Sequence, residues 1–246
     1  MGYADFNKRV YSSVFIGIVM IFAVFTPGDM VFRVFLTFCA LMAAFEIVSG
    51  VATVDDDAVI DAYKKRNNGM VMPSPRGGFF VVLEAIFCCI TPVFYVWLID
   101  DKWYLLMIFL VCMTSDASGY LVGKFIGKNT VPGIRKISPH KTIEGYLGSL
   151  LFSIAAGVLL YMFLPIERSF AQAVFVCFGG LIACTGDLLG SVTKRELGLD
   201  DSNAVTLYLP GIKWLEWPMA GHGGYLDRFD SIIFAVVVCA LLQLFL

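Results

Sequence analysis

Long runs of apolar residues alternate with polar segments along most of the chain. Each run approaches the roughly 20 residues that an α-helix needs to cross a bilayer, and the last run is the shortest. In lipid the backbone must satisfy its own hydrogen bonds, and an α-helix does so within one segment. The pattern predicts an all-α, polytopic integral membrane protein with about seven transmembrane helices. The seven runs are residues 10–26, 30–50, 79–99, 103–127, 146–165, 169–189 and 231–246.

The first run has two interpretations. Lys8 and Arg9 precede it, as basic residues precede the apolar core of a cleaved secretory signal. No small-x-small cleavage motif follows it, however, and Pro27 ends the run. We therefore prefer a retained membrane anchor.

Composition supports the membrane assignment. Hydrophobic residues make up 59% of the chain and charged residues 15%, and the mean hydropathy is +0.80. Such values are typical of integral membrane proteins. The net charge of −2 comes without any basic tract, so nucleic-acid binding is not expected. All seven cysteines fall in apolar runs without a C-x-x-C motif, which indicates buried free thiols.

The distribution of basic residues predicts the orientation. If the N-terminus is inside, all of the 18 Lys and Arg residues except Arg33, Lys102 and Arg168 fall on the inside. Cytoplasmic loops of membrane proteins carry such an excess of Lys and Arg. The polar segments 128–144 and 190–230 are then two large cytoplasmic loops.

Two of the acids within the predicted spans, Asp116 and Glu46, invite a choice between a functional and a structural role. Asp116 is well inside the run 103–127, where an unpartnered carboxylate costs several kcal/mol, so a functional role is the first hypothesis. A structural partner such as Ser115 or Ser118 is the alternative. Glu46, near the end of the second run, could reach a polar site or simply lie at interface depth.

A stripe of small residues accompanies Asp116. Ser115, Gly119, Gly123 and Gly127 recur every four residues, a spacing that lets two helices approach closely. We interpret these glycines as packing residues. They do not form a nucleotide-binding Walker loop, because the required G-x₄-G-K-[ST] spacing is missing.

Carboxylates and cations gather in the last quarter of the chain. Asp187, Ser191 and Lys194 fall at i, i+4 and i+7, which is one stripe of a helix. Asp227 and Asp230 are three residues apart at the start of the final run, where a helix dipole favours negative charge. Carboxylate oxygens suit Mg²⁺, which often takes substrate phosphates as further ligands. The pattern indicates a phosphate-handling metal site at a membrane surface.

Two blocks of sequence resemble a known family. The first is S-x-x-K-R from Ser191, followed by G-H-G-G-x-x-D-R-x-D from Gly221. The second is D-A-S-G-Y from Asp116, followed by S-P-H-K-T-I-E-G from Ser138. Together they resemble the signature of the CDP-diacylglycerol synthase (phosphatidate cytidylyltransferase) family, in the family's order, over roughly residues 112–231.

The resemblance implies a function and a division of the chain. A member of this family transfers the cytidylyl group of CTP to a lipid phosphate such as phosphatidate and releases pyrophosphate, with Mg²⁺. Residues 1–110, with the polar loop 51–78, would form N-terminal membrane helices, and residues 111–246 the catalytic membrane domain. The expected partners are CTP, the lipid phosphate and the bilayer, and a homodimer is an open alternative. The expected location is the cell (inner) membrane, with the active site facing the cytoplasm.

The resemblance also implies roles for individual residues. Asp187, Asp227 and Asp230 would be the metal ligands, and with Lys194 they would be the catalytic residues. The expected cofactor is Mg²⁺, and a second cation is left open. Lys141 would contact a phosphate or headgroup, with Glu144 as its orienting partner. The residues expected to bind substrate or phosphate are Asp116, Lys141, Glu144, Ser191, Arg195, Gly221, His222, Gly223, Gly224 and Arg228.

The chain departs from the family pattern in one region. Asp200-Asp201 stands where the family usually has Lys-Asp, and the segment 202–220 is longer than usual. These differences bear on the identity of the lipid tails. Two other functions stay open: a CTP-dependent polyprenol or phytol kinase, and a membrane transporter that uses Asp116 and Asp187 along an ion path.

Overall fold

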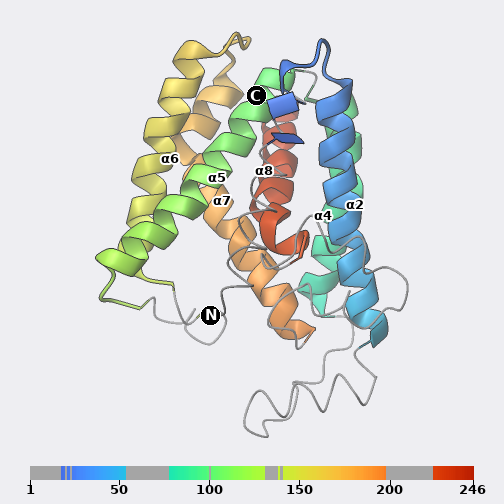
Figure 1. Ribbon diagram of the computed structural model, residues 1–246, viewed down its shortest axis with the longest axis vertical. Coiled ribbons are helices and arrows are strands. Elements are labelled where there is room, and N and C mark those ends of the chain that lie inside the picture. The colour runs from blue at the N-terminus through green and yellow to red at the C-terminus, as the bar shows by residue number, and fades with distance from the viewer. Residues whose placement is uncertain are drawn as a thin grey trace, which may run out of the picture. The chain divides into compact units, whose positions relative to one another are not determined.

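A computed structural model describes residues 18–19, 21–22, 24–53, 78–99, 101–130, 138, 141–197 and 224–246. Its secondary structure is helical, and the described residues form no strand beyond one isolated bridge between Thr130 and Thr142 (Figure 1). The all-α prediction is confirmed. The helices are α2 (Met30–Thr53), α4 (Phe79–Trp97), α5 (Lys102–Phe125), α6 (Ile143–Phe163), α7 (Phe170–Glu196) and α8 (Leu226–Phe245).

These helices correspond to the second through seventh predicted spans. Five of them, α2, α5, α6, α7 and α8, are long and apolar enough to cross a membrane, and the described side chains of α4 form the apolar segment Phe79–Phe94. The protein is therefore an integral membrane protein. The first predicted span, residues 10–26, lies largely outside the described residues.

Two helix boundaries differ from the prediction more than the others do. α7 continues to Glu196, beyond the expected end near residue 189, and α8 begins at Leu226 rather than at Ser231. Hydropathy marks where a helix becomes polar, not where it ends. Both extensions are held by contacts with N-terminal helices, described below. Residues 190–196 and 226–230 are therefore helical rather than loop.

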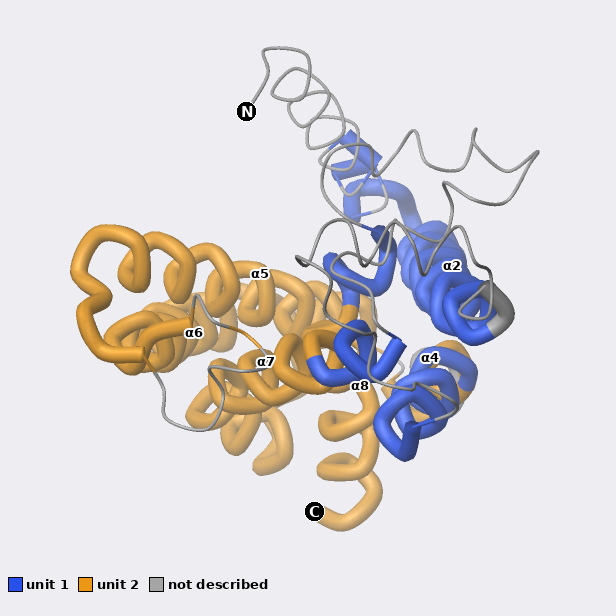
Figure 2. Tube along the Cα trace, turned by 90° about the horizontal axis from the view of Figure 1, so that it is seen from below, with its two compact units in different colours: residues 1–89, 192–229 blue, residues 90–191, 230–246 orange. Residues whose placement is uncertain are grey.

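The chain forms two compact units (Figure 2). Unit 1 contains residues 1–89 and 192–229, and unit 2 contains residues 90–191 and 230–246. The units interleave along the chain, so they follow a different division from the segments 1–110 and 111–246. The predicted division into residues 1–110 and 111–246 concerns function and stays a prediction.

In unit 2, α5, α6 and α7 lie side by side and pack through small residues (Figures 1 and 2). A Cβ atom added at Gly119 of α5 would lie 2.2 Å from Ser149 Oγ of α6. A Cβ atom at Gly180 of α7 would lie 2.0 Å from Ser153 Oγ, also of α6. The predicted packing role of Gly119 is confirmed, because the helices approach too closely for a side chain there.

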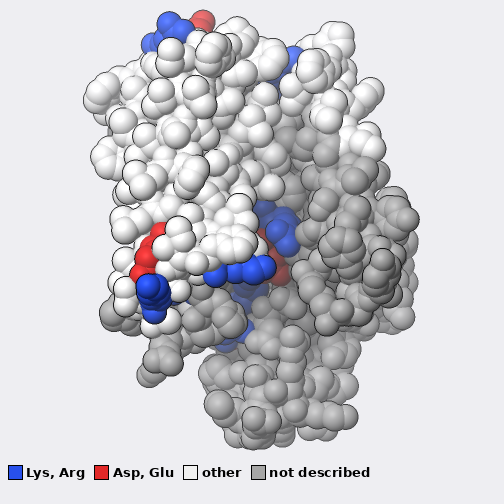
Figure 3. All heavy atoms as spheres, turned by 60° about the vertical axis from the view of Figure 1, so that its left-hand side comes forward, with Lys and Arg blue, Asp and Glu red and all other residues white. Residues whose placement is uncertain are grey.

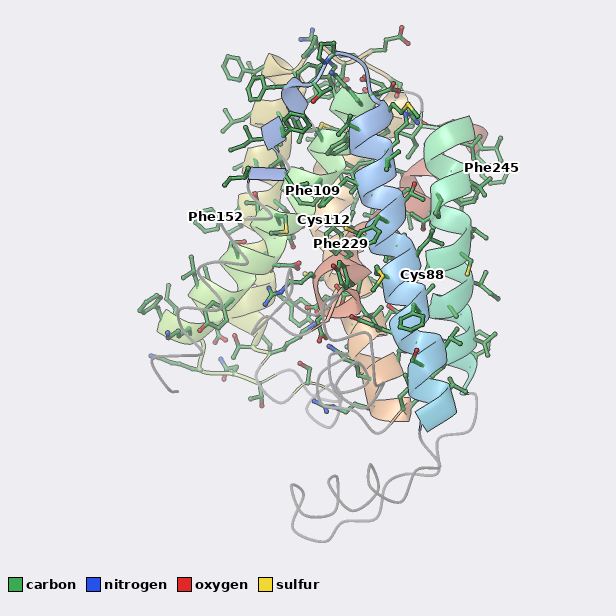
Figure 4. All side chains as sticks on the ribbon, turned by 45° about the vertical axis from the view of Figure 1, so that its right-hand side comes forward. Cys88, Phe109, Cys112, Phe152, Phe229 and Phe245 are labelled. Carbon is green, nitrogen blue, oxygen red and sulfur yellow. The ribbon has the colours of Figure 1, made fainter. Side chains whose placement is uncertain are left out.

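Apolar side chains cover much of the outside of unit 2. Figure 4 shows Phe152 of α6 pointing away from the helices, whereas Phe109 and Cys112 of α5 lie among them. On the face in Figure 3, a broad uncharged area separates the charged side chains at its two ends. This is the arrangement expected of helices whose outer surface faces hydrocarbon.

Substitutions at two glycines test the α5–α6 packing. We expect Gly119→Ala to cost about 1–3 kcal/mol of unfolding free energy, because its methyl group would overlap Ser149 Oγ. Adding Ser149→Ala should recover part of this loss. In the control, Gly157→Ala, the methyl group would be no closer than 3.4 Å to Val176, so little loss is expected. Unfolding in detergent measures all three, and equal stability of Gly119→Ala and Gly157→Ala would contradict the packing.

Candidate functional site

Unit 2 contains a cavity of about 570 Å³ beside the close contact of α5 and α6. Glycines form part of its wall, since Gly119, Gly123 and Gly145 have no side chains to fill the space. Asp116 and Asp187 place two carboxylates on its surface. The remaining residues that line it are Tyr120, Lys124, Lys141, Thr142, Tyr146, Ser149 and Cys184.

An ion pair joins the segment before α6 to α7. Lys141 Nζ lies 2.6 Å from Asp187 Oδ2, and Thr142, the next residue, caps the N-terminus of α6. Burial by itself would lower the pKa of Lys141, but the charge of Asp187 outweighs this, and the pKa of Lys141 is raised. The ammonium therefore remains charged beside the cavity at neutral pH.

Two further carboxylates lie around Ser231 of α8. Its hydroxyl Oγ is 3.2 Å from Asp116 Oδ2 and 3.3 Å from Asp230 Oδ1, and its backbone N–H donates to Asp230 Oδ1 over 2.7 Å. One side chain thus contacts two carboxylates from different helices. Asp230 Oδ2 also lies against Gly190 of α7, where an added Cβ would be 2.5 Å away.

Asp116 connects the residues around Ser231 with the Lys141–Asp187 ion pair. It lines the same cavity as Asp187, through which solvent reaches it, although protein surrounds most of the side chain. The charges of Asp230, Asp187 and Lys141 all act on its carboxylate. Three carboxylates and one cation of unit 2 are therefore within electrostatic reach of one another.

Unit 1 contains a separate charged pair. Lys194, in the last turn of α7, forms an ion pair with Asp227, in the first turn of α8. Asp227 also accepts a hydrogen bond from the backbone N–H of Gly224 over 3.3 Å. Both side chains of the pair are largely buried, with relative exposures of 15% and 11%. The arrangement holds an ammonium group at the end of α7.

Residues 71–246 match the model of the "Cytidylyltransferase family". The chain belongs to this family. Relatives named "Phosphatidate cytidylyltransferase" occur in Staphylococcus haemolyticus, Staphylococcus epidermidis and Staphylococcus aureus. Each is 31% identical over 170 residues, which cover 64% of this chain and 58% of the relative. The chain thus spans little more than half the length of these relatives. No solved structure matches it.

The structure brings several of the predicted site residues together. Asp116, Lys141, Asp187 and Asp230 gather in unit 2. In unit 1, Lys194 and Gly224 both contact Asp227. Ser191 and Arg195 lie on α7, and Arg228 is exposed in the first turn of α8. Gly221, His222 and Gly223 lie outside the described residues.

Two expected partners are corrected. Lys141 pairs with Asp187, whereas Glu144 accepts hydrogen bonds from the backbone N–H and side-chain amide of Asn129. Glu144 begins a new helix and faces back along the chain, so it holds the turn before α6 rather than the lysine. Asp116 contacts Ser231, and not Ser115 or Ser118, whose hydroxyl groups donate to backbone carbonyls of α5 and α7.

Sequence reasoning did not include Ser231 in the site. It directly follows the D-R-x-D motif, which was the available signal, but its contact with Asp116 depends on how α5 and α8 pack. For Glu46 the sequence left two interpretations open, a polar site or a position at interface depth. The structure shows it buried and hydrogen-bonded to the backbone at the start of α8. No spacing in the sequence relates these residues, because they come from different helices.

The residues of unit 2 fit a hard divalent cation. Asp116, Asp187 and Asp230 supply oxygen donors only, and their mutual repulsion is what such a cation would offset. Within the described part of the chain, however, no three His, Cys, Asp or Glu side chains are arranged closely enough to form a ready-made metal site. Mg²⁺ usually keeps waters and substrate phosphates as ligands, so a complete cage of protein ligands is not required.

Replacing Ser231 tests the contact between the two carboxylates. We expect Ser231→Ala to lower the unfolding free energy by about 1–2 kcal/mol, because Asp116 and Asp230 lose a shared donor. Ser153→Ala is a matched control, since this equally buried hydroxyl donates to the carbonyl of Leu150 in its own helix. Chemical unfolding in detergent compares the two variants, and an equal loss would show that Ser231 has no special role.

Proposed function

We propose that this chain transfers the cytidylyl group of CTP to a phosphatidate-like membrane lipid and releases pyrophosphate. Membership of the cytidylyltransferase family and the name of its bacterial relatives support this reaction. The observation that carries it is the grouping of Lys141, Asp187 and Asp116 around one cavity. A cation and metal-binding carboxylates are what two reacting polyanions require.

The reaction joins two phosphates. An oxygen of the lipid phosphate attacks the α-phosphorus of CTP, and the bond from that phosphorus to the oxygen bridging to the β-phosphorus breaks. The bonding electrons leave with pyrophosphate, and the lipid keeps the cytidylyl group. The attacking phosphate is anionic near neutral pH, so a strong general base is not needed. Catalysis then depends on alignment of the two phosphates and on neutralising their charge.

The lysines have the central roles in this proposal. Lys141 projects beside the cavity with its charge retained, and we assign it to the phosphate groups of the substrates. Lys194 would stabilise the charge that moves onto the departing pyrophosphate, and Asp227 would orient its ammonium group. Arg195, in the last turn of α7, and Arg228, in the first turn of α8, would bind phosphates through their planar, two-pronged guanidinium groups.

Mg²⁺ is the proposed cofactor. Of the three predicted ligands, Asp187 and Asp230 lie in unit 2, together with Asp116, and these carboxylates would hold the ion. When bound, Mg²⁺ would neutralise phosphate charge. Asp227 is engaged by Lys194 in unit 1, so its role as a ligand stays a prediction.

Product analysis tests the function. The purified protein in phosphatidate-containing nanodiscs, given Mg²⁺ and labelled CTP, should form CDP-lipid and pyrophosphate in equal amounts. Chelation of Mg²⁺ should stop the reaction. Release of CDP with a phosphorylated polyprenol would instead indicate a kinase, and no consumption of nucleotide would leave a transporter.

The same assay tests Lys194. We expect Lys194→Ala to lower kcat about 100-fold or more with little change in lipid binding, because its charge acts mainly in the transition state. Lys194→Arg should recover only part of the activity. Lys102→Ala, at the start of α5, is the control lysine and should keep wild-type turnover. A Lys194→Ala variant with wild-type kcat would exclude the proposed role.

The proposed orientation places the site on the cytoplasmic face of the cell membrane. The inside excess of basic residues supports it. Single cysteines replacing Lys65 and Lys102, in a background without the native cysteines, should react with an impermeant thiol reagent from opposite sides of oriented vesicles. Labelling of both from one side would disprove the seven-span orientation.

A further inference from the structure

A carboxylate from α2 holds the N-terminus of α8. Glu46 Oε1 accepts a hydrogen bond from the backbone N–H of Tyr225 over 2.8 Å, and its Oε2 accepts one from Leu226 over 2.9 Å. Tyr225 directly precedes α8 and Leu226 begins it, so no carbonyl of the same helix is available to these N–H groups. Glu46 therefore acts as a cap supplied by a distant part of the chain.

Aromatic contacts support the same junction. Phe38 of α2 packs edge-to-face on Tyr225 with ring centroids 5.8 Å apart, and Phe35 packs similarly on Phe229 at 6.3 Å. Glu46 is 2% exposed within the candidate span Met30–Val51. A carboxylate is costly in such a span unless it is paired. The two N–H groups, together with the positive end of the α8 dipole, supply that pairing.

The capped turn carries a proposed site residue. Asp227 directly follows Leu226, and it forms the ion pair with Lys194 at the end of α7. A series of contacts thus leads from Glu46 to the backbone of residues 225–226, then to Asp227, and finally to the Lys194 ammonium. All of these residues belong to unit 1.

We propose that Glu46 is a positioning residue that holds Asp227 opposite Lys194. Glu46 precedes the region matched by the family model, residues 71–246, so this contribution comes from the N-terminal part of the chain. The inference rests on the proposed function for its catalytic consequence, whereas the positioning itself can be measured without substrate. Its alternative is a structural role, in which Glu46 stabilises the fold without affecting the pair.

The first experiment measures how well Asp227 engages Lys194. The variant is Glu46→Gln, which keeps the shape of the side chain but replaces one acceptor oxygen by an NH₂ group that cannot accept a hydrogen bond. An ammonium held against a carboxylate resists acylation, because it must first give up its proton and its partner. We expect Lys194 in Glu46→Gln to be acylated by an amine reagent severalfold faster than in wild type, approaching Asp227→Asn. Mass spectrometry of the labelled peptide gives the rate.

The matched control is Phe35→Leu, which weakens the same α2–α8 contact without touching the cap. It should lower the melting temperature at least as much as Glu46→Gln, yet leave the labelling of Lys194 at the wild-type rate. The proposal is overturned if Glu46→Gln leaves this rate unchanged, or if Phe35→Leu raises it equally. Glu46→Asp, which keeps both oxygens on a shorter side chain, should fall between wild type and Glu46→Gln.

The second experiment measures turnover on protein that remains folded by size exclusion. Glu46→Gln should lower kcat about tenfold or more and change the KM for CTP much less, because misalignment acts mainly on the transition state. Phe35→Leu should keep kcat. Wild-type kcat in Glu46→Gln would refute the catalytic consequence. If the wild type forms no CDP-lipid, the proposed function fails, and the labelling of Lys194 still decides whether Glu46 positions the pair.

Discussion

Polar groups inside apolar helices have to find their partners within the protein, and much of this structure follows from that constraint. Glu46 of α2 binds the N-terminus of α8, Glu84 of α4 binds Thr193 of α7, and Asp116 of α5 contacts Ser231 of α8. Glu46 and Glu84 are buried, and an unpaired carboxylate in hydrocarbon costs several kcal/mol, whereas Asp116 also borders the cavity. Each acid therefore specifies which helix lies next to it, in a way that apolar side chains alone do not.

The same contacts place the proposed catalytic groups. The end of α7 is held by α4. Glu84 accepts a hydrogen bond from the Thr193 hydroxyl, and Glu196 accepts one from the backbone N–H of Val81. The start of α8 is held by α2 through Glu46. Lys194 and Asp227 lie on these two extensions, beyond the apolar runs. The N-terminal helices thus have a physical connection to the site, although the recognisable motifs all lie after them.

Close packing and an open cavity have one cause in unit 2. Glycine at positions 119, 123 and 145 lets α5 and α6 approach each other, and it also leaves space beside them. Membrane helices gain little from apolar burial against one another, so small residues that permit close backbone contact help to hold them together. Asp116 and Lys141 border the resulting space and give it a charged lining. A larger residue at 119 would disturb both the packing and the cavity.

The sequence by itself determined the membrane class, the approximate helices and the types of residue in the site. Hydropathy finds apolar helices because a span has a minimum length, and the D-R-x-D and K-R motifs are local strings. The sequence did not predict which residues meet in the fold. Lys141 pairs with Asp187 rather than with Glu144, Asp116 contacts Ser231, and Glu46 binds the start of α8. The observed helix ends at Glu196 and Leu226 could not be predicted either, since they depend on partners in α4 and α2. Only the tertiary structure decides such features, because sequence spacing relates residues within one helix, and which side chains meet between helices depends on how the helices pack.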